Sequence, residues 1–199
     1  MAGTKSRVAV AAAGGVLMLV TGVGTAEAGS GAPAASRFAE QAESAHLTSA
    51  QTTALQADVD RYLTKMGGTQ VALNKIDLNG KGEVLVALKG EAHPRDFASG
   101  DGTRIAADPC RTGPVSGIFC AYQRDNFAGT RIDMVTCNER YYVSTWGRGG
   151  SWINDQTHRP KREAQMYNPS GRLIYTTPPP YSSDAHGDWN PVRYVIPCR

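Results

Sequence analysis

Four cysteines and four histidines are the side chains of this sequence best suited to hold a transition metal. Zinc sites place Cys and His ligands at short, regular spacings such as C-x-x-C. No C-x-x-C occurs, and no histidine lies at ligand spacing from a cysteine or from another histidine. We therefore expect disulfides, with no metal and no cofactor. The cysteines are Cys110, Cys120, Cys137 and Cys198.

A pair of carboxylates is the second kind of candidate site, because two acids at a suitable separation hydrolyse glycosidic bonds. Asp133 with Glu139, or Asp184 with Asp188, would be the candidates. Isolated acids in strands and turns are usually solvated, and the sequence contains neither G-x-S-x-G nor H-E-x-x-H. We expect no enzyme and no catalytic residue.

The first residues are typical of a secretory signal peptide. Lys5 and Arg7 precede an uncharged, apolar run from Val8 to Val23, and Ala26-Glu27-Ala28 fits the A-x-A cleavage pattern. Glycines dilute the run too much for a membrane anchor. The sequence predicts a signal peptide over 1–28 and a secreted, extracellular product that no membrane holds.

Secretion favours disulfides, and four cysteines allow three pairings. Gly113-Pro114 and Gly117 lie between Cys110 and Cys120 and let the chain double back. A local Cys110–Cys120 bond leaves Cys137 to pair with Cys198.

Composition changes at Cys110. Residues 29–109 carry 8 basic and 10 acidic side chains with 3 aromatic ones, whereas residues 110–199 carry 11 basic and 7 acidic side chains with 12 aromatic ones. The whole-chain charge of +3 is too small to indicate a nucleic-acid partner. The sequence predicts two separable modules and a monomer.

The first module is expected over 45–92, after a flexible linker over 29–44. Thr48 and Gln51 fit a capping box, and an apolar stripe at helical spacing runs on to a Gly67-Gly68 stop. Two β-prone runs, Thr69 to Leu78 and Glu83 to Leu88, then predict a hairpin. This α-β-β module is followed by an expected linker over 93–109.

The second module shows short β-prone runs separated by Gly- and Pro-rich turns, which is typical of a sandwich or small barrel. We expect an all-β domain without helices over 110–199. The runs are Ile118 to Gln123, Gly129 to Val135, Tyr141 to Thr145, Glu163 to Tyr167, Leu173 to Thr177 and Val192 to Ile196.

One motif narrows the fold. Tyr122, Phe127 and Gly129 match the aromatic-x4-aromatic-x-Gly signature of β/γ-crystallin Greek keys, in which the glycine takes a conformation that a Cβ would strain. With the runs around it, residues 110–199 resemble the actinobacterial secreted β/γ-crystallin-type proteins grouped with the Streptomyces metalloproteinase inhibitor. The resemblance implies a β/γ-crystallin-like Greek-key sandwich.

The resemblance also implies inhibition of an extracellular metallopeptidase by a rigid loop. Residues 153–165 contain no cysteine, so the family's disulfide-braced reactive segment has no counterpart there and its reactive bond is assigned to no residue. A short disulfide loop loses little entropy on docking. We therefore favour Arg111, Gly113, Pro114 and Val115 over the glycine-rich turn from Trp146 to Trp152.

A different class of function stays open, namely a non-inhibitory extracellular module that binds cell wall or glycan, or a killer-toxin-like relative. An exposed strip of Trp146, Trp152 and Trp189 with neighbouring tyrosines would favour it, although aromatic residues of such a domain usually form its core. The cationic run from His158 to Arg162 is a candidate contact with an acidic surface. Asn154-Asp155 begins like a calcium motif, but His158 and Arg159 stand where hydroxyl ligands belong.

Overall fold

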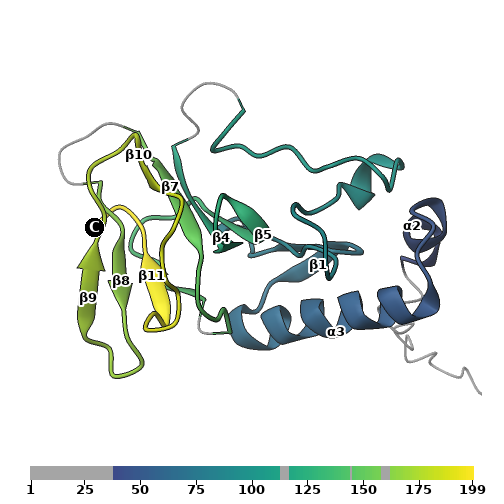
Figure 1. The fold of residues 1–199 in the computed structure, drawn as a ribbon, viewed down its shortest axis with the longest axis horizontal. Helices are drawn as coiled ribbons and strands as arrows, with labels where there is room; N and C mark the ends of the chain where they lie inside the picture. Colours follow the sequence, from purple (N-terminus) through teal and green to yellow (C-terminus); the bar gives the residue numbers. More distant parts are fainter. Residues whose placement is uncertain (1–37, 113–116, 144, 158–161) are drawn as a thin grey trace, which may run out of the picture. The chain divides into compact units, whose positions relative to one another are not determined.

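The computed structural model describes residues 38–112, 117–143, 145–157 and 162–199, all of which belong to one unit. The expected signal peptide lies outside these ranges. No helix in the described ranges is long and apolar enough to cross a bilayer. The elements (Figure 1) are α2 Ala39–Ser44, α3 Ser49–Met66, β1 Thr69–Ala72, β2 Lys75–Asp77, β3 Gly82–Leu85, the short 3-10 helix η1 Phe97–Ser99, β4 Ile118–Arg124, β5 Ala128–Met134, β6 Tyr141–Tyr142, β7 Ser151–Asp155, β8 Gln165–Tyr167, β9 Leu173–Thr176, β10 Ser182–Asp184 and β11 Tyr194–Ile196.

Helix α3 begins and ends where the sequence predicts. The Thr48 hydroxyl accepts the Gln51 N–H at 3.2 Å, and the Gln51 side chain accepts the Thr48 N–H at 2.9 Å, so the capping box is confirmed. Gly67 ends the helix at φ 71°. Leu55 and Val59 on its apolar stripe are fully buried, which fixes the helix against the sheet.

The expected two-stranded hairpin is wrong in one respect, because the run from Thr69 to Leu78 is broken in two. β1 pairs with β2, and β2 pairs with β3, all antiparallel. The break occurs where the buried Asn74 side chain donates to the carbonyls of Val86 and Arg95 at 3.0 and 2.9 Å. These bonds tie the turn between β1 and β2 to two later segments.

A seven-stranded antiparallel sheet joins the two expected modules. Its order is β1-β2-β3-β5-β4-β7-β10, so β3 of the first segment pairs with β5 of the second. Val84 and Ile132 are register partners in this pair, and both are fully buried. The composition change at Cys110 therefore does not separate two cores, and the described residues of both segments pack together.

Two segments that we expected to be linkers hold ordered structure. Residues 39–44 form α2, although 29–44 reads as a flexible stretch. In 93–109, Phe97 of η1 is only 2 % exposed, and Arg95 forms a β-bridge with Ile105. Residues 93–109 are rich in Gly, Asp and Ala, which is typical of a linker, but Phe97 among them packs into the core.

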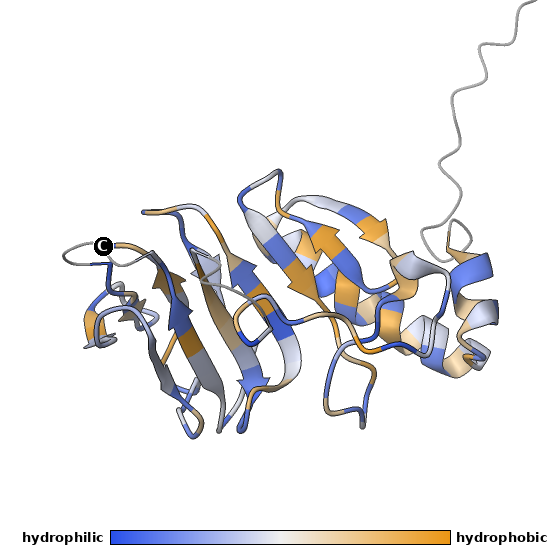
Figure 2. Ribbon diagram, turned by 90° about the horizontal axis from the view of Figure 1, so that it is seen from above, coloured by the Kyte–Doolittle hydropathy of each residue, from blue (hydrophilic) through white to orange (hydrophobic). Residues whose placement is uncertain are grey.

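The second segment is mostly antiparallel β-structure, as expected, and no helix lies in its described residues. β4, β5, β6, β8, β9 and β11 fall on the six predicted runs, whereas β7 and the polar β10 were not predicted. β6, β11, β8 and β9 form a second sheet in that order. Figure 2 shows hydrophobic and hydrophilic residues alternating along many strands, which gives each sheet a buried face.

The tryptophans belong to the core that joins helix and sheets. Trp146, Trp152 and Trp189 are each 2 or 3 % exposed and lie in one cluster with α3 residues. The Trp146 indole donates to the Tyr62 hydroxyl at 2.7 Å. This bond connects α3 to the glycine-rich turn before β7.

Candidate functional site

The structure contains the two disulfides expected from the sequence. Cys110 bonds to Cys120 across 10 residues, and Cys137 bonds to Cys198 across 61 residues. The first joins the segment after η1 to β4, and the second joins the segment after β5 to the residue that follows Pro197. Disulfides of this kind indicate an oxidising environment.

Backbone hydrogen bonds hold both ends of the candidate inhibitory loop, in a local turn at Asp108 on one side and on the end of β7 on the other. On one side the backbone N–H groups of Arg111 and Thr112 donate to the Asp108 carbonyl at 3.0 and 2.9 Å. On the other side the Gly117 N–H donates to the Asp155 carbonyl at 2.9 Å. We call Asp108, Cys110, Arg111, Thr112, Gly117 and Cys120 the loop base.

The centre of the candidate loop, with Gly113, Pro114 and Val115, lies outside the described residues. Arg111 is described and exposed, with its guanidinium 5.4 Å from the centre of the Phe127 ring. Such a cation–π contact contributes roughly 0.5–1 kcal/mol at an exposed site. Phe127 therefore supports Arg111 on an open surface beside a pocket of about 450 Å³.

The motif residues Tyr122, Phe127 and Gly129 meet at the β4–β5 hairpin. The Tyr122 and Phe127 rings touch edge to face, with centroids 5.5 Å apart. Gly129 has φ 84°, and a Cβ there would lie 3.1 Å from the Arg124 Nε and the Gln123 Cβ. The two rings and the glycine therefore lie together at this hairpin.

A polar network of partly and fully buried side chains contacts the loop base at Asp108. The Tyr122 hydroxyl lies 2.9 Å from both carboxylate oxygens of Asp108. Arg131 donates to Asp133 through Nε at 2.7 Å and through Nη2 at 3.0 Å, and it also reaches the Ala107 carbonyl at 2.8 Å. We call Asp108, Tyr122, Arg131 and Asp133 the Asp108 network.

Burial sets the protonation of this network. It raises the pKa of Tyr122 far above its usual range, and the charge of Asp108 adds to this effect. Tyr122 therefore stays a donor to Asp108. Burial also raises the pKa of Asp133 to about 6, against the opposing pull of the Arg131 guanidinium. At neutral pH Asp133 remains an anion that is paired with Arg131, so these two buried groups fix each other's position.

We expect Asp133 to give the protein a measurable pH dependence. Between about pH 4 and pH 6 the folded state keeps a proton on Asp133 that the unfolded chain has released, so the free energy of unfolding falls as pH rises. The wild-type value minus that of Asp133→Asn should fall by up to about 3 kcal/mol across this window in urea titrations. If this difference in the free energy of unfolding did not change with pH, the raised pKa of Asp133 would be contradicted.

Other candidate residues are engaged in structure. Asp133 pairs with Arg131, and Glu139 lies 3.1 Å from Lys81, so this pair of acids forms no open carboxylate site. Asn154 is fully buried, and its amide donates to the carbonyls of Arg162 and Pro178, so it does not serve a surface calcium site. Most of the cationic run lies outside the described residues.

The alternative turn from Trp146 to Trp152 is also braced. Asp125 accepts the Gly150 N–H at 2.6 Å, and the flanking tryptophans are buried. Gly150 has φ 136°, and a Cβ there would lie 2.0 Å from the Trp189 ring. The two ends of this turn pack against the core, whereas Gly147 and Arg148 within it are exposed, as Arg111 is.

The remaining candidate acids, Asp184 and Asp188, both line a groove of about 430 Å³. Trp152, Met166, Ile174 and Tyr175 form much of its apolar surface. Asp184 and Asp188 are the second carboxylate pair considered in the sequence analysis. In the groove they lie together with apolar residues from strands that are distant in the chain. No local sequence signal indicates this combination.

Comparisons with models of protein families, with curated proteins and with solved structures found no match.

Proposed function

We propose that this protein is a secreted inhibitor of extracellular metallopeptidases and that it contacts them through the segment closed by the Cys110–Cys120 disulfide. The observation that carries the proposal is the loop base. A disulfide and backbone hydrogen bonds to Asp108 and Asp155 fix Thr112 and Gly117 on either side of the segment. The resemblance of 110–199 to crystallin-type inhibitors gives this base its functional interpretation.

The physical advantage of such a base is a low cost of ordering. A flexible segment loses conformational entropy when a peptidase cleft immobilises it, at about 0.5–1.5 kcal/mol for each side chain with many rotamers. Anchors on both sides remove part of that loss before binding. The Asp108 network stiffens the anchor further, because Asp108 accepts from Tyr122 and from the Cys110 N–H at 3.1 Å.

The glycan-binding alternative has less support from the described residues. Stacking on sugars needs exposed aromatic faces. All three tryptophans are buried, and they donate or pack inside the core. The aromatic strip that would favour this alternative is therefore not formed by Trp146, Trp152 and Trp189.

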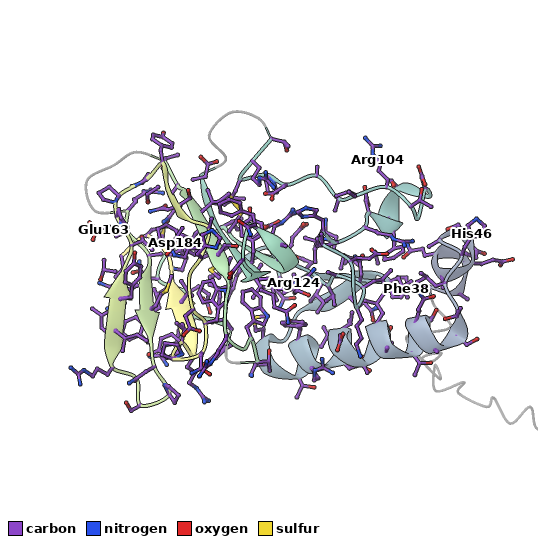
Figure 3. All side chains as sticks on the ribbon, viewed as in Figure 1. Phe38, His46, Arg104, Arg124, Glu163 and Asp184 are labelled. Carbon is purple, nitrogen blue, oxygen red and sulfur yellow. A yellow bond between two sulfur atoms is a disulfide. The ribbon has the colours of Figure 1, made fainter. Side chains whose placement is uncertain are left out.

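Substitution of the loop tests the proposal. Replacing Arg111 and Val115 with Ala together should weaken inhibition of a responsive metallopeptidase at least about tenfold, or about 1.4 kcal/mol. The matched control replaces Arg104 and Val135 with Ala, because both side chains are exposed outside the loop base. Arg104 lies on the segment after η1 (Figure 3).

Inhibition constants, measured beside thermal unfolding of each variant, separate the outcomes. The loop variant should lose affinity without losing stability, and the control should lose neither. Equal inhibition by the loop variant and the wild type would place the contact elsewhere.

A further inference from the structure

We propose that the groove lined by Ile174, Tyr175, Asp184 and Asp188 binds an extended peptide segment that carries a lysine or arginine side chain. Residues of β9 and of β10 line the groove, and each of these strands is the last one of its sheet. The groove therefore lies between the outer strands of the two sheets. Figure 3 labels Asp184 at this position. The inference concerns a surface separate from the loop base.

Two apolar residues of the groove, Ile174 and Tyr175, lie on β9 at the edge of its sheet. All four residues of β9 are exposed, and Ile174 and Tyr175 keep 39 and 42 % of their surface accessible. An outer strand also presents alternate N–H and C=O groups that no neighbouring strand satisfies. Lysine and proline, which usually protect such edges, do not occur in Leu173–Thr176. This edge fits an added strand.

Each of the two acids of the groove accepts a hydrogen bond from the backbone. One oxygen of Asp184 accepts the His186 N–H, and one oxygen of Asp188 accepts the Asn190 N–H, each at 2.9 Å. Within the described ranges, no hydrogen bond or ion pair reaches the second oxygen of either carboxylate. His186, which also lines the groove, has its Nδ1 3.5 Å from Asp125. Two carboxylate oxygens are therefore available to a bound cation.

An apolar surface beside two carboxylates favours a ligand that is apolar along its length and positively charged at its end. A lysine or arginine side chain has an apolar stem and a charged end. The stem would lie on Ile174 and Tyr175, and the charged end would lie between Asp184 and Asp188. Asp184 and Tyr175 line the same groove, and burial together with the negative charge of Asp184 raises the pKa of Tyr175. A neutral saccharide would leave the charge complementarity unused. Of the aromatic residues that line the groove, Tyr175 is exposed, whereas Trp152 and Trp189 are almost fully buried.

Peptide titrations test the inference directly. The probe is acetyl-Thr-Val-Arg-Val-Thr-amide, and its citrulline analogue removes the charge while keeping the shape. Calorimetry and tryptophan fluorescence should show the arginine peptide binding at least about tenfold more tightly than the citrulline peptide, with the difference shrinking as salt is added. N-methylation of the peptide backbone should weaken binding, since it blocks strand addition.

Protein variants give the second arm of the test. The double substitution Asp184→Asn and Asp188→Asn should reduce affinity for the arginine peptide at least about tenfold, and the exposed substitution Ile174→Gln should also weaken it. The matched control is Asp96→Asn with Asp101→Asn, because these acids accept backbone N–H groups two residues ahead in the same way but lie outside the groove. Asparagine can keep such turns, so the fold is preserved.

Three results would overturn the inference. They are no saturable binding of the arginine peptide in the millimolar range, equal affinity for the arginine and citrulline peptides, and binding of chitohexaose alone. Peptidase inhibition by the Asp184 and Asp188 double variant should equal that of the wild type, so failure here is distinguishable from failure of the proposed inhibitory function.

Discussion

A chain that begins at Asp108 is expected to remain unfolded, although composition alone suggests that this segment is independent. Without residues 38–107, β5 loses its partner β3, and the core loses Leu55, Val59, Ile76 and Val84, which are each at most 1 % exposed. Burial of one such side chain contributes about 1.5–3 kcal/mol, so the loss exceeds about 6 kcal/mol. A typical domain has only about 5–15 kcal/mol of stability.

Circular dichroism and proton NMR of this shortened chain provide the measurement, with a chain that begins at Gly29 as the control. The control should unfold cooperatively and give dispersed amide signals, and the shortened chain should do neither. A cooperative transition in the shortened chain would show that 108–199 folds without β3 and α3.

Replacing Cys137 and Cys198 with Ser should destabilise the protein by about 4 kcal/mol, because the bond closes a long loop in the unfolded chain. The matched variant replaces Cys110 and Cys120 with Ser, and its shorter loop predicts a smaller loss of about 3 kcal/mol. Urea unfolding under non-reducing conditions gives both values.

The variant that loses less stability, with Cys110 and Cys120 replaced, should lose more inhibition. Loss of the Cys110–Cys120 bond should weaken inhibition, whereas the Cys137–Cys198 variant should inhibit normally at a temperature where it is folded. A greater loss of stability in the Cys110 and Cys120 variant than in the Cys137 and Cys198 variant would contradict the loop-length argument.

Local signals in the sequence predicted local structure well. The capping box at Thr48 fixed the start of α3, and the short spacing of Cys110 and Cys120 gave the first disulfide and left the second pair. These features depend on residues close together in the chain. The strands β4 and β5 belong to the same class, since each falls on one short β-prone run.

Features that depend on distant residues were not visible in the sequence. The pairing of β3 with β5 joins segments of opposite charge, and no local pattern encodes it. Arg131 and Asp133 lie two apart on one strand and share a face, but nothing near them indicates that Tyr122 and Asp108 complete the network. Likewise, the groove acids Asp184 and Asp188 meet an apolar wall from β9 only in the folded protein.

Inhibition assays with the chain beginning at Gly29 test the proposed function most directly, using a panel of metallo-, serine and cysteine peptidases. Residual activity on a small chromogenic substrate is measured as the protein is added. The proposed function predicts saturable inhibition of at least one metallopeptidase, lost on reduction of the disulfides. Full activity of every metallopeptidase at saturating protein, or inhibition confined to the other two classes, would contradict it.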